Sequence, residues 1–132
     1  MARNIEIDIN HVIYCGVTAP AKDQVEMLQI ASRSGLLPAI SDTVTKMGLV
    51  ASLAAVDATS FNRLKVLCLT NGKIVRQSDN VPVAENLFQD DAHNFLMLIG
   101  RVLKENIGPF WQLSSSEGAD EGPNSEAVQA QK

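Results

Sequence analysis

The chain has 132 residues, a hydrophobic content of 45% and a formal net charge of −4. That length suits one domain with a substantial core. Residues 114–132 carry −3 of this charge, so residues 1–113 carry the remaining −1. A nearly neutral body has no electrostatic footprint for nucleic acid, and no apolar run approaches the roughly 18 residues of a membrane span. The opening MARNIEIDIN also lacks the apolar core of a signal peptide.

The first predicted element is a β-hairpin over residues 4–17. Isoleucines alternate with polar residues from Ile5 to Ile9, which predicts a strand with one face buried. Asn10-His11 suits a two-residue turn, and residues 12–17 suit the return strand. A hairpin alone is marginally stable in water, so we expect its apolar face to pack on the helices that follow.

A first helix is predicted over residues 22–34. Gly35 follows it and suits the left-handed residue that ends many helices. The apolar spacing predicts that Met27 and Ile30 flank the buried face, and that the inward side chains are Val25 and Leu28, to which Ala31 and Ser32 can be added.

Two further helices are predicted in the middle of the chain. A cap at Ser41 or Asp42 starts one that runs to about Val56. Ser60 is the predicted cap of a short buried helix over residues 61–69, although its last three residues also suit a strand. Two short apolar segments stay open between strand and irregular structure, namely residues 74–77 and 81–83.

The longest amphipathic signal is DDAHNFLMLIGRVLKENIGPFWQL, residues 90–113. Its apolar stripe at helical spacing consists of Phe95, Leu96, Ile99, Val102, Leu103 and Ile107. Arg101, Lys104 and Glu105 fall between these residues and are predicted to face water. Asp90 and Asp91 are predicted to cap this closing helix, and Gly108-Pro109 is predicted to stop it through a left-handed glycine.

These elements predict a mostly α fold of the α+β class, with an N-terminal β-hairpin, a helical body and a long closing helix. Residues 1–113 are predicted to form a single folded domain. Residues 114–132 are rich in Ser, Gly, Glu and Ala, too polar to form a core, and are predicted to be an acidic disordered tail. Such a tail suits a solubilising end or a segment that docks on a partner.

No motif of an active site or a metal site is present in the sequence. His11 and His93 stand in no metal-ligand pattern, and the glycines are too scattered for a phosphate-binding loop. Cys15 and Cys68 lie far apart, which favours reduced thiols over a disulfide. We therefore expect no enzymatic activity, no metal and no cofactor.

Three residues near the end of the predicted domain are candidates for partner binding. Phe110 and Trp111 follow the closing helix and suit either a lid on the core or an aromatic anchor in an interface, where Trp is over-represented. Arg101, on the polar side of the same helix, is the third candidate.

Three segments in this order resemble the tail assembly chaperones of long-tailed, siphophage-like bacteriophages. They are the opening hairpin IDINHVIYCG (7–16), the first helix QVEMLQIASRSGLLPA (24–39) and the closing helix MLIGRVLKENIGPFW (97–111). His11 stands where that family more typically has a glycine, and residues 70–90 match only loosely. None of these motifs is catalytic.

The resemblance implies a non-enzymatic phage protein that acts in the host cytoplasm and is absent from the mature virion. It implies two partners, the tape measure protein, which the chaperone keeps soluble, and the tail tube protein, whose subunits it helps to recruit. A homo-oligomer and a frameshifted longer form stay open. The alternative is a small phage or bacterial regulator or adaptor that binds a host protein without catalysis.

Overall fold

The computed structural model describes residues 2–40 and 45–111. The elements in chain order are β1 (Asn4–Ile9), β2 (Val12–Val17), α1 (Ala21–Arg33), η1 (Pro38–Ile40), α2 (Lys46–Ala54), α3 (Ala58–Lys65), η2 (Val66–Thr70), β3 (Val75–Arg76), β4 (Val81–Pro82), η3 (Glu85–Phe88), α4 (Ala92–Ile107) and η4 (Gly108–Trp111). The predicted fold class is confirmed, because a β-hairpin precedes a mostly helical body with a long last helix. The predicted caps Ser41 and Asp42 and the predicted tail over residues 114–132 lie outside the described residues.

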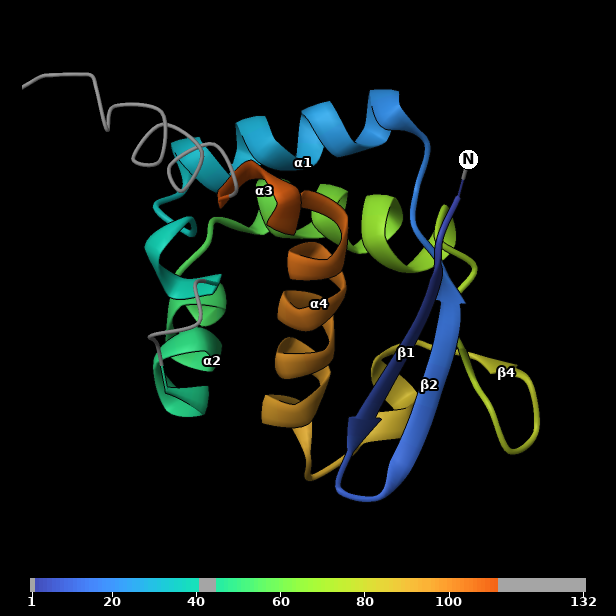
Figure 1. Ribbon diagram of the computed structural model, residues 1–132. Coiled ribbons are helices and arrows are strands. Elements are labelled where there is room, and N and C mark those ends of the chain that lie inside the picture. Colours follow the sequence, from blue (N-terminus) through green and yellow to red (C-terminus); the bar gives the residue numbers. More distant parts are fainter. Residues whose placement is uncertain (1, 41–44, 112–132) are drawn as a thin grey trace, which may run out of the picture.

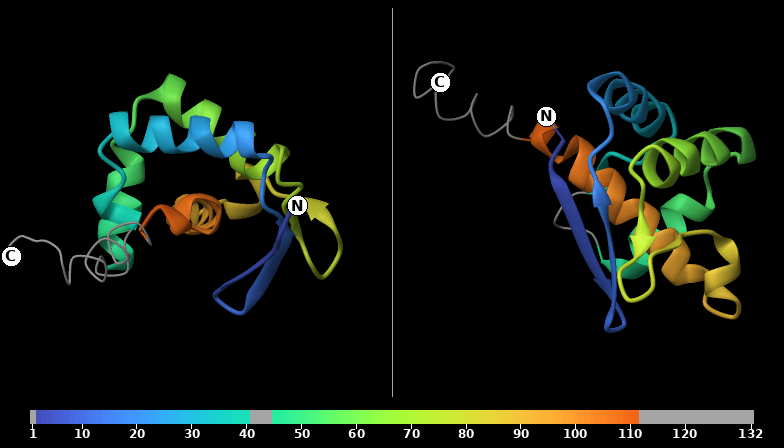
Figure 2. Two further views of the ribbon diagram at one scale, coloured as in Figure 1. Left: turned by 45° about the horizontal axis from the view of Figure 1, so that its top comes forward. Right: turned by 90° about the vertical axis from the view of Figure 1, so that its right-hand side faces the viewer.

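The long helix α4 stands at the centre of the fold (Figure 1). The hairpin packs on one side of α4 and α2 packs on another, while α1 and α3 lie across its C-terminal end. Figure 2 shows this enclosure from two further directions. Because α4 is surrounded in this way, most of its side chains are buried rather than one stripe of them.

The hairpin has the predicted register. β1 and β2 pair antiparallel with Ile5 opposite Gly16 and Ile9 opposite Val12, and all three isoleucines of β1 are buried. Asn10 and His11 both have positive φ, 52° and 70°, as a tight two-residue turn requires. The short apolar segments left open by the sequence form β3 and β4, which extend the hairpin to a four-stranded antiparallel sheet.

The predicted apolar stripe of α4 is confirmed for its main residues, but burial extends beyond it. Phe95, Ile99, Val102, Leu103 and Ile107 are buried, and so are Met97, Leu98 and the polar Asn94 and Asn106. Elements pack on α4 from several directions, whereas the sequence predicted burial along one stripe.

Both predicted ends of α4 are correct in position, but their geometry differs from the prediction. Asp91 occupies the N-cap position but makes no side-chain hydrogen bond to the helix backbone, and Asp90 has a positive φ of 66°. Gly108 has helical angles, φ −52° and ψ −39°, instead of the predicted left-handed ones. The chain therefore continues past Pro109 as the 3-10 turn η4, which is compatible with proline because its φ is already close to helical values.

The end of α1 is as predicted, but its buried face is not. Gly35 has φ 73°, and the Leu36 N–H donates to the carbonyl of Ala31 at 2.8 Å, which is a Schellman ending. The predicted inward residue Val25 is 58% exposed, whereas Met27 is fully buried. Both alternatives satisfy the helical period, and the packing of α1 on α3, α4 and η2 decides which residues are buried.

The starts of α2 and α3 also differ from the prediction. Thr45 caps α2, where its Oγ1 accepts a hydrogen bond from the Gly48 N–H at 3.0 Å. Asp57, rather than Ser60, caps α3, and its Oδ2 accepts from the Ser60 N–H at 3.0 Å. The last residues of the predicted short helix form the π-helix η2, so they are not a strand.

Candidate partner-binding surface

Among the described α-helices, α2 is the least charged and the least buried. Its sequence KMGLVASLA carries one charged residue, Lys46, and one fully buried residue, Leu53. A helix that is apolar all round is normally enclosed by the rest of the protein. α2 instead packs mainly on α4 and η1, so its other side remains open to solvent.

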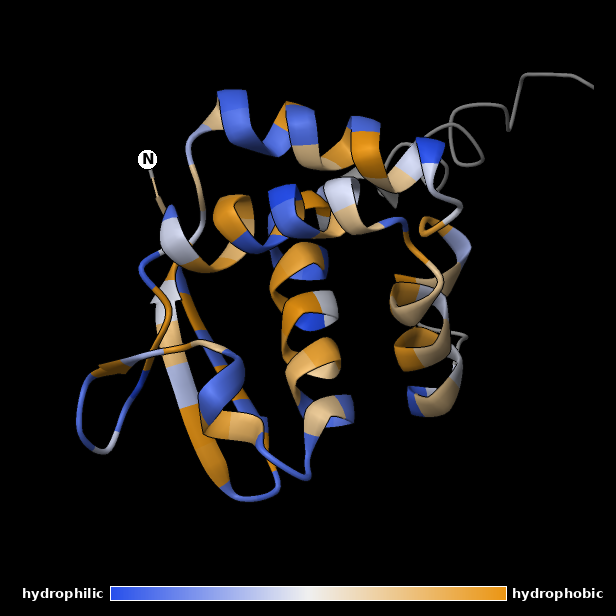
Figure 3. Cartoon of the chain, turned by 180° about the vertical axis from the view of Figure 1, so that it is seen from behind, coloured by the Kyte–Doolittle hydropathy of each residue, from blue (hydrophilic) through white to orange (hydrophobic). Residues whose placement is uncertain are grey.

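Four exposed apolar residues of α2 and its C-cap lie on one side of the helix. We call them the outer face of α2, and they are Met47, Ala51, Ala54 and Ala55, whereas the exposed Lys46 lies outside this set. Helical spacing places these four residues within about one quarter of the helix circumference. Met47 is 81% exposed, more than any other large hydrophobic side chain in the described residues. Figure 3 shows α2 at the edge of the molecule, apolar along most of its length.

Gly100 of α4 sets how closely α2 can approach. A Cβ at Gly100 would lie 2.9 Å from the Cδ1 atoms of both Leu49 and Leu53. The inner side of α2 therefore packs almost directly on the α4 backbone, with the outer face directed away. This contact was not predicted from the sequence, although a glycine inside a strongly amphipathic helix is itself a signal of close packing.

The structure places Arg101 on the hairpin side of α4, away from α2. Its half-buried side chain donates from Nη1 to the backbone carbonyl of Asp8 at 3.0 Å, so it joins α4 to β1. Phe110 and Trp111 belong to η4, which follows α4. The side chains of Phe110 and Trp111 lie outside the part that the structure describes, and partner binding by the three residues stays a prediction.

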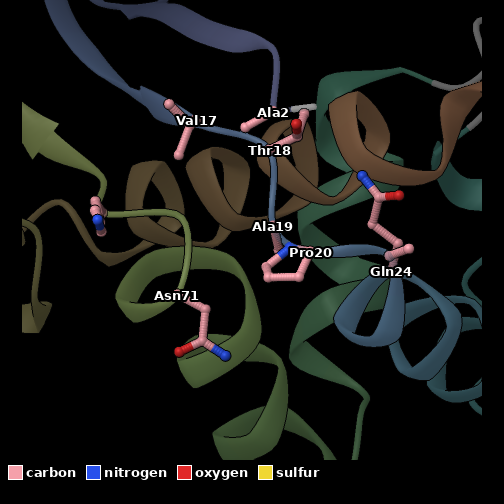
Figure 4. A pocket seen from close by; sticks show the side chains of 9 residues that line it. Ala2, Val17, Thr18, Ala19, Pro20, Gln24 and Asn71 are labelled. Atoms are coloured by element: carbon pink, nitrogen blue, oxygen red, sulfur yellow. The ribbon is translucent and has the colours of Figure 1, made fainter.

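A hollow beside α1 offers few polar groups that are free to bind a ligand. It has a volume of about 460 Å³ and lies between the end of β2 and the N-terminus of α1 (Figure 4). Three of its polar side chains already have partners within the protein: Thr18 Oγ1 accepts from the Arg3 N–H at 2.8 Å, Gln24 donates to Asn106 at 3.3 Å, and Asn71 donates to Asp23 at 2.8 Å. These bonds join the N-terminal segment to the end of β2, α1 to α4, and α1 to the end of η2.

The two cysteines are free thiols in different environments. Cys15 is half-buried on β2, whereas Cys68 is completely buried in η2. Burial raises the pKa of the Cys68 thiol to about 12, so it stays protonated and unreactive at neutral pH. Within the described ranges, no cluster of three or more His, Cys, Asp or Glu side chains could hold a metal ion. No helix there is long and apolar enough to cross a membrane.

Comparisons with known proteins identify the family. Neither a search of curated proteins nor a search of solved structures found a match. The family model described as "Phage tail assembly chaperone protein, TAC" matches residues 16–118, which is well over half of the 132 residues. The match includes the four α-helices of the described residues and therefore the outer face of α2. The chain belongs to the phage tail assembly chaperone family.

Proposed function

We propose that this chain binds the tape measure protein, keeps it soluble, and helps to recruit tail tube subunits around it. It does so in the host cytoplasm, without catalysis or a cofactor, and it is absent from the mature virion. Family membership supports the general role. The observation that carries the finer proposal is the outer face of α2, an uncharged apolar surface that the fold holds open to solvent.

The outer face suits the apolar stripe of a long helix. Its three alanines are small, so a second helix can approach to the 8–10 Å of ordinary helix packing. Met47 is unbranched and adaptable, so it can fill gaps of different shapes along one stripe. Burial of apolar area contributes roughly 25 cal/mol per Å² to the binding free energy and needs no sequence-specific contacts. The outer face can therefore cover the apolar surface of an insoluble client.

The limited size of this face also suits release. α2 has nine residues and is therefore about 14 Å long, so its outer face is much smaller than the roughly 800 Å² per partner of a stable interface. Each contact with the tape measure protein should be weak, and several copies of the chaperone should cover one client. Tube subunits that bury more area can then displace them.

Co-expression with the tape measure protein tests the proposal. We expect wild-type chaperone to raise the soluble fraction of the tape measure protein and Ala51→Glu to abolish that gain, because a charge on the outer face would be desolvated on binding. Ala21→Glu is the matched control, since Ala21 is an exposed alanine on α1. Both variants should retain the wild-type melting transition. A tape measure protein that is equally insoluble with and without the chaperone would overturn the proposal.

A further inference from the structure

The face of the sheet that is turned away from α4 is a second uncovered surface. Because the isoleucines of β1 point inward, the alternating Glu6 points outward, opposite Cys15 of β2, which in turn pairs with Val75 of β3. In the right panel of Figure 2 the strands lie in front of α4, and none of the described helices covers them. We call Glu6, Cys15, Val17, Lys73 and Val75 the open sheet face.

This face is hollowed and carries opposite charges on opposite sides. The hollow has a volume of about 430 Å³, and the five residues of the open sheet face all line it. Cys15, Val17 and Val75 supply an apolar floor. Glu6 stands on the β1 flank and Lys73 on the β3 flank, with β2 between them.

Both charged groups are available for a partner. The ammonium group of Lys73 makes no hydrogen bond or ion pair with any described residue, and Lys73 is exposed. Glu6 is also exposed, and its carboxylate accepts one long hydrogen bond, from Gln77 Nε2 at 3.3 Å. A partner that covers the apolar floor should therefore offer a positive group to Glu6 and a negative group to Lys73.

We infer that the partner is a second copy of this chain, packed sheet against sheet. A two-fold axis along β2 would place the β1 flank of one copy over the β3 flank of the other. Glu6 of each copy would then lie near Lys73 of its partner, so one arrangement forms the same pair twice, as an isologous interface requires. Stacked sheets lie about 10 Å apart, a gap that Glu and Lys side chains can span together.

The dimer should be weak and reversible. The sheet has only four strands, two of them with two residues each, so the face is smaller than the roughly 800 Å² per partner of a stable interface. The dimer is also independent of client binding through α2. Glu6 and Cys15 precede the region matched by the family model, which begins at residue 16, whereas Val17, Lys73 and Val75 lie within it.

Charge reversal tests the inference through sedimentation velocity over a range of protein concentrations at low ionic strength. We expect wild-type chain to pass from monomer to dimer as its concentration rises. Glu6→Lys and Lys73→Glu should each lower the dimer fraction, since each creates two like-charged pairs, and the double variant should restore it. Lys22→Glu, on the exposed side of α1, is the matched control and should dimerise like wild type. All variants should show the wild-type circular dichroism spectrum.

Crosslinking through Cys15 gives a second, independent readout. On the proposed axis the two Cys15 thiols face each other, while Cys68 is buried and unreactive. A short bismaleimide should therefore link wild-type chains into dimers, link Glu6→Lys poorly, and link the double variant well. A chain that remains monomeric at every concentration overturns the inference. A dimer fraction that neither Glu6→Lys nor Lys73→Glu changes overturns it as well. Either result leaves the α2 proposal standing.

Discussion

Gly100 of α4 lies directly against the side chain of Leu53 of α2. A Cβ built on Gly100 would lie only 2.9 Å from Cδ1 of Leu53, below the separation of real side-chain contacts. Leu53 is 1% exposed, so its methyl group is enclosed by the core and has limited room to move. This contact holds the inner side of α2 against α4 and thereby directs Met47 and Ala51 into solvent.

Two substitutions of Gly100 should therefore distinguish the effect of side-chain volume at this site from the effect of helix propensity. Gly100→Ala crowds Leu49 and Leu53, but alanine is better than glycine in a helix by roughly 1 kcal/mol, so we expect a nearly neutral change in the free energy of unfolding. Gly100→Leu cannot be accommodated by a methyl rotation and should destabilise the fold by about 1–3 kcal/mol or more. Urea unfolding measures both values. An equal loss for the two variants would mean that volume at this site does not control stability.

Substitutions of Ile99 and Arg101 test which face of α4 is buried. Ile99 is fully buried, so Ile99→Ala should lower the free energy of unfolding by about 2–5 kcal/mol through lost burial and a residual cavity. Arg101→Ala removes one partly exposed hydrogen bond to the Asp8 carbonyl and should lower it by about 1 kcal/mol or less. Thermal or urea melts should rank the two variants in this order, and a reversed order would contradict the packing of α4.

The local sequence pattern correctly predicted those elements in which buried residues recur with a single clear period. The isoleucines of β1 alternate strictly, and a slip of one residue would expose all of them, so their register followed from the sequence. The stripe of α4 from Phe95 to Ile107 is likewise long enough to exclude other periods. The prediction that Gly35 ends α1 was correct, because the positive φ at this position favours glycine.

The remaining differences arise where the decision depends on packing between distant segments. In α1, Val25 and Met27 both satisfy a helical period, and the packing of α1 on α3, α4 and η2 buries Met27. Gly108 can adopt left-handed or helical angles equally well, so its conformation was not determined locally. The outer face of α2 could not be predicted either, because an apolar helix is normally expected to be buried. Its exposure depends on where α4 places it.

The ion pair between Glu26 and Arg63 should make stability depend on pH. The Glu26 carboxylate accepts from Arg63 Nε at 2.5 Å and from Nη2 at 2.8 Å, and these hydrogen bonds lower the pKa of Glu26 in the folded state. The unfolded chain has a pKa near the ordinary value of about 4.3. The pair therefore stabilises the fold above that pH, and this contribution is lost as the pH falls through the lower folded-state pKa.

Two variants isolate this effect. Glu26→Gln and Arg63→Gln should both be less stable than wild type at neutral pH, and the difference should shrink in acid, as measured by urea midpoints at several pH values. Both groups are at the surface, so high salt should reduce the difference as well. A difference that is constant with pH would show that the pair acts through packing rather than charge.

Asn106 should be a stabilising polar residue in the core. It is 5% exposed, its Oδ1 accepts from the Ala19 N–H at 2.8 Å, and its Nδ2 donates to the Val102 carbonyl at 2.9 Å. Asn106→Leu adds apolar volume but leaves the buried Ala19 N–H without a partner. An unsatisfied buried donor costs about 1–3 kcal/mol, so we expect a net loss of stability of that order despite the more hydrophobic side chain.

Because Ala19 immediately precedes α1, the loss should be local as well as global. Amide hydrogen exchange at Ala19 should accelerate in Asn106→Leu more than exchange at Leu98, which lies in the middle of α4. Asn62→Leu is the matched control, since Asn62 is exposed on α3, and its free energy of unfolding should stay within roughly 0.5 kcal/mol of wild type. If Asn106→Leu proved as stable as wild type with Ala19 still protected, the N–H must have found another acceptor, and the junction between β2 and α1 would depend on packing rather than on the Asn106 amide.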